Sequence, residues 1–209
     1  MMIKLKVCGM KFPRNIEALM EINPDYIGMI FYPKSKRYVV DSLSPSFIRN
    51  LPKNIKKVGV FVDSSIENIE YEVNKFQLDA VQLHGNESVE FCEKIKKSHL
   101  VLIKAFHIFQ GFEFKTTEDY KTAADYYLFD TQTKLYGGSG NKFEWKLLNQ
   151  YNNEKPFFLS GGIGFEDLDT LKELKNYNIH AIDINSRFEL SPGLKDIEKI
   201  KLFKEQFYK

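Results

Sequence analysis

The chain has 209 residues, 43% of them hydrophobic and 28% charged, which is the composition of a globular protein long enough to bury a sizeable core. With 30 Lys and Arg against 28 Asp and Glu, the net charge is +2, and so small a basic excess argues against a nucleic-acid partner. No apolar run is long enough to cross a bilayer, which argues against a membrane partner.

Cysteine usage and the first residues bear on the compartment. Cys8 and Cys92 lie far apart in the sequence and indicate no disulfide framework, so we expect two free thiols in a reducing compartment. An apolar, β-branched run begins at Ile3 and leaves no room for a signal peptide. The sequence therefore predicts a cytoplasmic protein, and it leaves a monomer and a homodimer both open.

Short apolar, β-branched runs alternate with amphipathic stretches along the whole chain. The runs predict strands over residues 3–8, 26–31, 57–62, 80–84, 100–106, 126–130, 157–160 and 181–185. The amphipathic stretches predict helices over residues 15–22, 44–50, 66–75, 88–97, 117–123, 143–150, 166–175 and 195–206. This eightfold alternation favours an α/β fold, a closed (β/α)8 TIM barrel over an open doubly wound sheet. With no linker or composition break, we expect a single domain over residues 1–209.

Two strand ends carry residues suited to acid–base chemistry, which in parallel barrels collects where the carboxyl ends of the strands converge. Cys8 ends the first predicted strand and precedes Gly9, so its thiol is placed to react; the alternative is a small, inert core residue. Asp130 ends the sixth, where desolvation would raise its pKa and suit a general acid. A helix cap or a salt-bridge partner is the alternative for Asp130.

Glycine-rich and polar loops follow the last two predicted strands, where TIM barrels often hold a phosphate group. Gly161 and Gly162 follow the seventh strand, and Asn185 and Ser186 follow the eighth. Glycines let backbone amides approach phosphate oxygens, and a following helix adds partial positive charge. These four residues are the predicted phosphate site, with ordinary turns as the alternative.

Further loops add candidates around the same opening. Arg37 lies in a basic loop after the second strand, and its planar fork suits a carboxylate; a plain surface cation is the alternative. Gly138 belongs to a glycine cluster that is either a mobile flap or a linker. His84 ends the fourth strand and is expected to face the opening as a substrate or structural contact.

The remaining histidines have no carboxylate or cysteine at metal-ligand spacing, so no metal site is expected. They are interpreted as structural residues: His99, His107 and His180. Cys92 lies on the apolar stripe of a predicted helix and is interpreted as a core residue.

Taken together, these stretches resemble the phosphoribosylanthranilate isomerases of tryptophan biosynthesis. The resemblance lies in KVCGM (6–10), FYPKSKRYV (31–39), VGVFVD (58–63), VQLHG (81–85), FDT (129–131), YGGSG (136–140), LSGGI (159–163), DINSRFE (183–189) and SPG (191–193). The order of so many matches makes the resemblance specific, although each match alone is weak. One departure stands at Arg187, where the family often has glycine. Without glycine the backbone does not easily take positive φ, so the phosphate loop differs or Arg187 adds a cation.

The resemblance implies a (β/α)8 barrel that converts N-(5-phosphoribosyl)anthranilate, a sugar phosphate, into 1-(2-carboxyphenylamino)-1-deoxyribulose 5-phosphate by an Amadori rearrangement without a cofactor. It implies that Cys8 is the general base, Asp130 the general acid and Arg37 the partner of the anthranilate carboxylate. It places the phosphate at the loops of Gly161-Gly162 and Asn185-Ser186. A thiolate base at neutral pH requires a lowered pKa, which we expect for Cys8.

Three other functions compete with this one. The histidine-pathway isomerase performs the same rearrangement on a larger substrate. That family has a pair of aspartates as its acid–base residues, one of them at the position where this chain has Cys8. A metal-dependent pentose-phosphate epimerase would need more strand-end ligands than His84 and Asp63. A catalytically silent phosphate-binding barrel is the third alternative.

Overall fold

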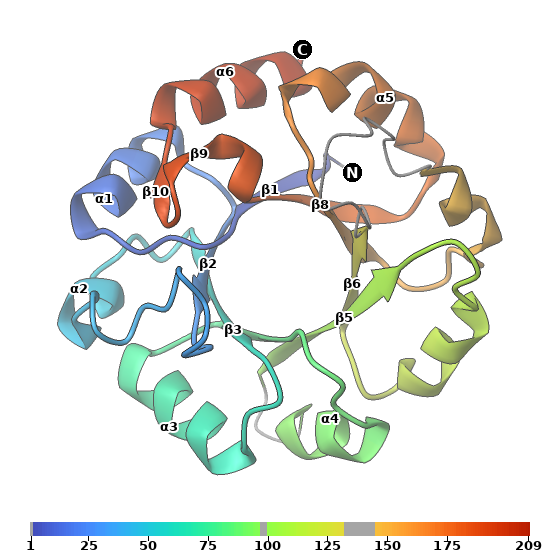
Figure 1. Cartoon of the computed structure of the whole chain (residues 1–209), viewed down its shortest axis with the longest axis horizontal. Helices are drawn as coiled ribbons and strands as arrows, with labels where there is room; N and C mark the ends of the chain where they lie inside the picture. The colour runs from blue at the N-terminus through green and yellow to red at the C-terminus, as the bar shows by residue number, and fades with distance from the viewer. Residues whose placement is uncertain (1, 97–99, 132–144) are drawn as a thin grey trace.

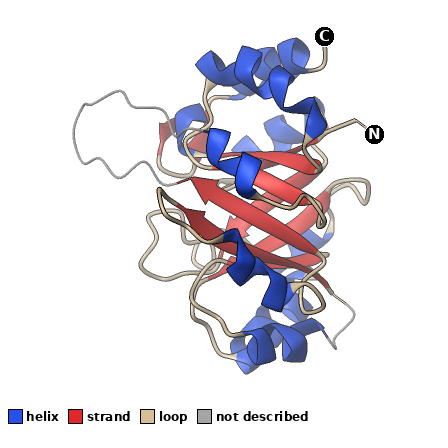
Figure 2. Cartoon of the chain, turned by 90° about the vertical axis from the view of Figure 1, so that its right-hand side faces the viewer, coloured by secondary structure: helices blue, strands red, loops and turns tan. Residues whose placement is uncertain are grey.

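The structure is a computed structural model that describes residues 2–96, 100–131 and 145–209. Its parallel strands close into a barrel in the order β1 to β8, and β8 pairs with β1 to complete the circle. Figure 1 looks along the barrel, with the helices arranged outside the strands, and Figure 2 shows the same enclosure from the side. The predicted (β/α)8 TIM barrel is confirmed.

The barrel strands lie within two residues of their predicted ranges at both ends. They are β1 (Lys4–Val7), β2 (Tyr26–Ile30), β3 (Lys56–Phe61), β4 (Ala80–Leu83), β5 (Val101–Ile108), β6 (Tyr126–Thr131), β7 (Phe157–Ser160) and β8 (Ile179–Ile184). Side chains alternate along each strand, so one set packs outward against the helices and the other points into the barrel. We use "barrel mouth" for the end where the strands have their carboxyl ends.

The α-helices are α1 (Pro13–Ile22), α2 (Pro45–Arg49), α3 (Ile66–Phe76), α4 (Val89–Lys96), α5 (Leu168–Glu173) and α6 (Ile197–Phe207). Within the described residues, five further segments are 3₁₀ helices: η1 (Phe114–Tyr120), η2 (Trp145–Gln150), η3 (Phe165–Asp167), η4 (Leu174–Asn176) and η5 (Ser186–Phe188). Among the described residues of the chain, no helix has the length and apolar character needed to cross a membrane.

Three predicted α-helices are wrong in type or extent. The segment predicted over 117–123 is the 3₁₀ helix η1, because the hydroxyls of Thr116 and Thr117 donate to carbonyls three residues earlier and compete with α-helical bonding. The segment predicted over 143–150 is η2, and residues 143 and 144 lie outside the described residues. The segment predicted over 166–175 is divided into η3, α5 and η4.

The helix predicted from Lys195 begins at Ile197 instead. Lys195 belongs to an antiparallel hairpin of β9 (Glu189–Ser191) and β10 (Leu194–Lys195), drawn in red beside α1 in Figure 1. Asp196 ends the extended segment by capping α6 through the backbone N–H of Lys199. The side chain of Asn15 in α1 bonds both backbone groups of Lys195, which holds β10 in place.

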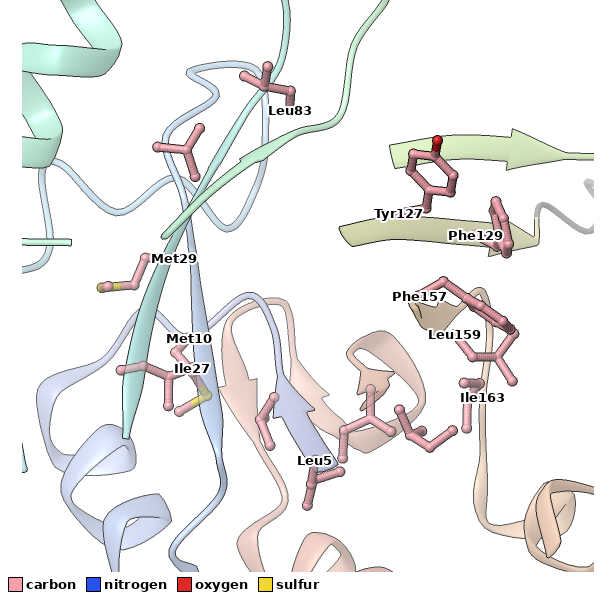
Figure 3. Close-up of a cluster of buried hydrophobic side chains, with 14 of the residues drawn as sticks. Leu5, Met10, Ile27, Met29, Leu83, Tyr127, Phe129, Phe157, Leu159 and Ile163 are labelled. Carbon is pink, nitrogen blue, oxygen red and sulfur yellow. The ribbon is translucent and has the colours of Figure 1, made fainter. Parts of the chain in front are cut away.

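The hydrophobic core has an outer and an inner part. Outward side chains such as Leu5, Ile27 and Phe129 pack between barrel and helices, as Figure 3 shows. Inside the barrel a separate apolar cluster fills the half nearer the amino ends of the strands: Tyr26, Val58, Ala80, Ile103, Ala105, Leu128, Phe158 and Ala181. The next inward positions on β1, β4 and β8 are polar, and they support the candidate site.

Candidate active site

A buried polar layer, formed by Lys6, Gln82 and Asp183, lies beneath the barrel mouth. Lys6 Nζ donates to Asp183 Oδ2 over 2.7 Å and to Gln82 Oε1 over 2.8 Å, and all three side chains are almost fully buried. Burial lowers the pKa of Lys6, but Asp183 and Cys8 outweigh it and the pKa is raised. Burial also raises the pKa of Asp183, and its Oδ1 has no hydrogen-bond partner among the described residues.

Cys8 lies above this layer, two residues after Lys6 and therefore on the same inward side of the chain. Its N–H donates to the carbonyl of Ile184 over 2.9 Å, and the residue is 5% exposed. Gly28 on β2 leaves the space that the thiol occupies, because a Cβ at Gly28 would lie 2.7 Å from Cys8 Sγ. Burial raises the pKa of Cys8 more than Lys6 and Lys195 lower it. The predicted lowering of this pKa is therefore wrong for this structure.

Asp130 comes from β6 and meets two histidines at the mouth. Its Oδ2 lies 3.0 Å from His84 Nε2 and 3.8 Å from His107 Nδ1. Burial raises the pKa of Asp130, but the hydrogen bond from His84 and the charges of His84, His107 and Lys6 outweigh burial, so the pKa is lowered. The predicted raised pKa is therefore wrong, because sequence reasoning considered desolvation and omitted the two imidazoles.

His107 is interpreted from the sequence as a structural residue because the sequence has no carboxylate at metal-ligand spacing from it, but the structure sets a carboxylate beside it. Its strand β5 pairs with β6 in a register that sets His107 directly opposite Asp130, although the two are far apart in sequence. Burial lowers the pKa of His107, and its Nδ1 has no hydrogen-bond partner among the described residues. His84 lies at the mouth, its ring 5.2 Å from that of His107.

These three residues form a group of potential metal ligands, with ligand atoms within 4.8 Å of one another. The distances from Asp130 bracket the roughly 3.4 Å that separates ligands around a tetrahedral zinc ion with bonds near 2.1 Å. A zinc-binding histidine, however, donates its second N–H to an acceptor. Here the second nitrogen of His84 faces the amide nitrogen of Gln82, a donor, at 2.7 Å. The hydrogen bonds therefore favour a proton-bearing His84 over a metal ligand.

A second charged cluster lies beside Cys8. Arg37 donates from Nε and Nη2 to the two oxygens of Glu189 over 2.8 and 2.5 Å. Lys195 Nζ donates to Glu189 over 2.7 Å and to Asn185 Oδ1 over 2.7 Å. Although burial raises the pKa of Glu189, these cations outweigh it and lower the pKa to about 2. Two of the donors of Arg37 thus already hold a carboxylate of the protein itself.

The cluster reaches the backbone next to the thiol. A Cβ at Gly9, which has φ +76°, would lie 2.7 Å from Asn185 Oδ1 and 2.8 Å from Arg37 Cδ. The predicted Arg37 and Asn185 are therefore brought together over the residue after Cys8. Sequence reasoning missed Lys195, because its segment was assigned to a helix.

The predicted phosphate residues occupy neighbouring loops, since β7 and β8 are paired strands. Gly161 and Gly162 have φ values of +102° and +67°, which glycine adopts readily. Ser186 begins η5 directly after Asn185. Arg187, the departure from the family pattern, forms an exposed ion pair with Glu166 of η3. Gly138, the predicted flap residue, lies outside the described residues.

Lys6, Gln82 and Asp183 were also missed by sequence reasoning. Each stands in a strand that reads as apolar, two positions before a residue that was noticed: Cys8, His84 and Asn185 respectively. The signal was available, because a charged residue in the middle of a buried strand needs a partner.

Comparison with known proteins gives one consistent result. The family model described as N-(5'phosphoribosyl)anthranilate (PRA) isomerase matches residues 5–206. An N-(5'-phosphoribosyl)anthranilate isomerase of Parabacteroides distasonis is 42% identical over 213 residues, covering 97% of this chain and 92% of that protein.

Two solved structures are similar over the whole chain. Monomers generated from the dimeric phosphoribosylanthranilate isomerase of Thermotoga maritima superpose with a TM-score of 0.81 at 30% identity, covering 99% of each chain. A phosphoribosyl anthranilate isomerase in complex with reduced 1-(o-carboxyphenylamino)-1-deoxyribulose 5-phosphate superposes with a TM-score of 0.81 at 31% identity, again covering 99% of each chain.

Proposed function

The chain belongs to the N-(5'-phosphoribosyl)anthranilate isomerase family and is an isomerase of tryptophan biosynthesis; from this we propose that Asp130 is its general acid and Cys8 its general base. The proposed reaction is the Amadori rearrangement of N-(5-phosphoribosyl)anthranilate to 1-(2-carboxyphenylamino)-1-deoxyribulose 5-phosphate. The observation that carries the proposal is that Cys8 directly follows β1 and Asp130 lies in the last two residues of β6, both at the same barrel mouth, with Lys6 influencing the pKa of both.

The chemistry divides into three steps. Asp130 gives a proton to the ring oxygen while the amino lone pair forms a C=N bond and the C1–O bond breaks, which yields an iminium ion. The Cys8 thiolate then removes the proton from C2, and the C–H electron pair neutralises the iminium to give an enolamine. C1 finally gains a proton and the C2 hydroxyl loses one, which leaves the ketone. Each acid–base role is typically worth about 10²–10⁴-fold in rate.

Catalysis in this scheme starts from the form with one proton on Asp130 and none on Cys8. The structure favours the opposite arrangement of the same proton, because the pKa of Asp130 is lowered and that of Cys8 is raised. The substrate favours the reactive form at two stages. On binding, the exclusion of water from Asp130 raises its pKa; after ring opening, the iminium charge next to Cys8 stabilises the thiolate.

Binding groups are proposed at either side of these two residues. Arg37, held by Glu189, would contact the anthranilate carboxylate with its remaining donors. The loops of Gly161-Gly162 and Asn185-Ser186 would hold the phosphate through backbone N–H groups. The related structure in complex with a reduced product supports a substrate of this class. A monomer and a homodimer are the two alternatives for this chain, and the dimeric Thermotoga maritima relative supports the homodimer.

The test is the loss of fluorescence of the anthranilate conjugate with purified protein. We expect turnover by the wild type and a loss of at least about 10²-fold in kcat for Cys8→Ser and for Asp130→Asn, with KM little changed. Cys92→Ser, in the buried face of α4, and Asp119→Asn, at an exposed position of η1, are the matched controls. Wild-type turnover in Cys8→Ser or Asp130→Asn would overturn that residue's role. Exclusive turnover of the histidine-pathway substrate would overturn the reaction itself.

A further inference from the structure

A line of hydrogen bonds crosses the barrel interior from beneath Cys8 to Asp130. It begins at Lys6 Nζ, which lies 2.8 Å from Gln82 Oε1. Gln82 Nε2 lies 2.7 Å from His84 Nδ1, and His84 Nε2 lies 3.0 Å from Asp130 Oδ2. Gln82 is 1% exposed, so its amide finds these partners inside the protein rather than in solvent.

The Lys6 ammonium group fixes the direction of the hydrogen bond between Gln82 and His84. An ammonium group has three donors and no acceptor, so the Gln82 atom that faces Lys6 must be the carbonyl oxygen. The ion pair of Lys6 with Asp183 keeps that ammonium in place. The NH₂ group of Gln82 is therefore turned toward His84, and the opposite amide orientation would set donors against an ammonium.

The orientation of Gln82 in turn fixes the tautomer of His84. An amide NH₂ group offers only donors, so His84 Nδ1 must accept and carries no proton. In the neutral ring the proton then lies on Nε2, which faces Asp130 Oδ2. Lys6 thus determines, through one buried amide, that the His84 nitrogen facing Asp130 carries the proton.

We propose that Gln82 is a positioning residue that holds His84 as the Nε2–H tautomer, so that His84 donates a hydrogen bond to the Asp130 carboxylate. The proposal rests on the proposed function, in which Asp130 is the general acid. As Asp130 gives its proton to the substrate, negative charge develops on its oxygens, and a donor already directed at Oδ2 stabilises that charge. The other tautomer would present a lone pair to Oδ2 and oppose the transfer.

Long-range ¹H–¹⁵N NMR of the ligand-free, ¹⁵N-histidine-labelled protein tests the tautomer directly. The sequence has four histidines, and the His84→Gln variant assigns the His84 signals by subtraction. In the neutral ring we expect an unprotonated Nδ1 and a protonated Nε2. A neutral His84 protonated on Nδ1 would overturn the proposal, and this measurement requires no variant at Gln82.

Two substitutions of Gln82 separate its orienting role from simple packing. In Gln82→Glu, a carboxylate can accept from Lys6 with one oxygen and from His84 Nδ1–H with the other, so we expect the tautomer to reverse. Gln82→Met, of similar length but without donors or acceptors, should leave both tautomers populated. An unchanged His84 tautomer in both variants would overturn the proposal. Tyr26→Phe is the matched control, because it removes a 2.8 Å hydrogen bond to His180 at the other end of the barrel and should leave the His84 signals unchanged.

Turnover gives a second measurement. For Gln82→Glu we expect kcat to fall roughly ten- to a hundredfold, because a hydrogen bond to a charged group is lost, with KM little changed. The acidic limb of kcat/KM should also move to higher pH. The groups that face Asp130 are His84, His107 and Lys6, and Asp183 also interacts with it from β8.

Gln82→Met adds no charge to this group and should move the limb in the same direction. A lower kcat with an unmoved limb in both variants would count against the proposal. Failure of the proposed function remains distinguishable: a wild type that does not turn over the anthranilate conjugate refutes that function, while the NMR tautomer decides the role of Gln82 by itself.

Discussion

Gly28 on β2 lies directly beside Cys8 on β1, so close that a Cβ at Gly28 would lie 2.7 Å from the sulfur and 3.1 Å from the Cα of Cys8. The candidate base therefore occupies a space that exists only because its neighbour has no side chain. The same closeness excludes water from the thiol, and burial is the largest cause of the raised pKa of Cys8.

Gly28→Ala should therefore reduce both stability and activity. The added methyl group must displace the Cys8 side chain, and overpacking of this kind costs about 1–3 kcal/mol in the free energy of unfolding. Urea unfolding measures that cost, and kcat should fall at least tenfold. The Gly28→Ala change made in a Cys8→Ala background should cost less, because the sulfur is gone. Equal costs in the two backgrounds would mean that the contact between the added methyl group and Cys8 Sγ does not cause the loss of stability.

Thiol alkylation should measure the pKa of Cys8, which burial raises and the Lys6 charge lowers. Because burial raises the pKa of Cys8 above its ordinary value of 9.0, alkylation by iodoacetamide should reach half its limiting rate above pH 9. Lys6→Met removes a charge that lowers this pKa, so the midpoint should move to still higher pH. A Cys92→Ser background leaves Cys8 as the sole thiol. A midpoint near pH 7 in wild type would contradict this expectation.

Breaking the buried ion pair of Lys6 and Asp183 should lower the free energy of unfolding. Lys6→Met leaves Asp183 without its ion-pair partner, and removing one member of a buried pair typically costs about 3–5 kcal/mol. Urea unfolding at neutral pH measures the cost. The double variant Lys6→Met with Asp183→Asn should recover part of the loss, because no unpaired charge remains. A double variant less stable than additivity predicts would argue against this account.

The pH dependence of kcat/KM should be broad and flat at neutral pH. Raising the pH removes the required proton from Asp130 but creates the required thiolate at Cys8, so between the two pKa values the reactive fraction is constant. The acidic limb should fall below pH 3.8 and the alkaline limb above pH 9, since the two pKa values are shifted apart. Measurements stop where unfolding begins, which circular dichroism at each pH would identify. Two limbs between pH 5 and 8 would contradict the assignment.

The lowered pKa of Glu189 should make the free energy of unfolding depend on pH. Its pKa is about 2 in the folded protein against an ordinary 4.5, so the unfolded chain takes up the proton first as pH falls. The stabilisation is present above pH 4.5 and is lost as the pH approaches 2. Glu189→Gln should therefore destabilise the protein at pH 7 and progressively less between pH 4.5 and 3. Urea unfolding of both proteins across this range is the measurement, and a constant difference would contradict the linkage.

How far the sequence predicts this molecule depends on whether the relevant partners are near in the chain. The strands follow from local apolar runs, so their positions were predicted to within two residues, and the closed barrel followed from their number. The 3₁₀ helix η1 was missed because Thr116 and Thr117 compete for backbone carbonyls, which periodicity does not report.

Within the site, sequence reasoning identified groups but not their environment. Asp130 was chosen for its position, yet its pKa direction was wrong, because His107 enters only through the register of β5 with β6. A lowered pKa is expected for Cys8 because a base needs one, whereas in the structure burial raises this pKa more than the nearby Lys6 and Lys195 lower it. Arg37 was chosen as a carboxylate partner, and the carboxylate beside it in the structure is Glu189, far along the chain.

The backbone N–H of Cys8 donates to the carbonyl of Ile184, so the first strand is held by the last. The β1 side of the site therefore depends on a strand that lies nearly the whole chain away in sequence. In a fragment without β8, Cys8 would lose this neighbour, and its thiol would be open to oxidants and to other thiols on that side.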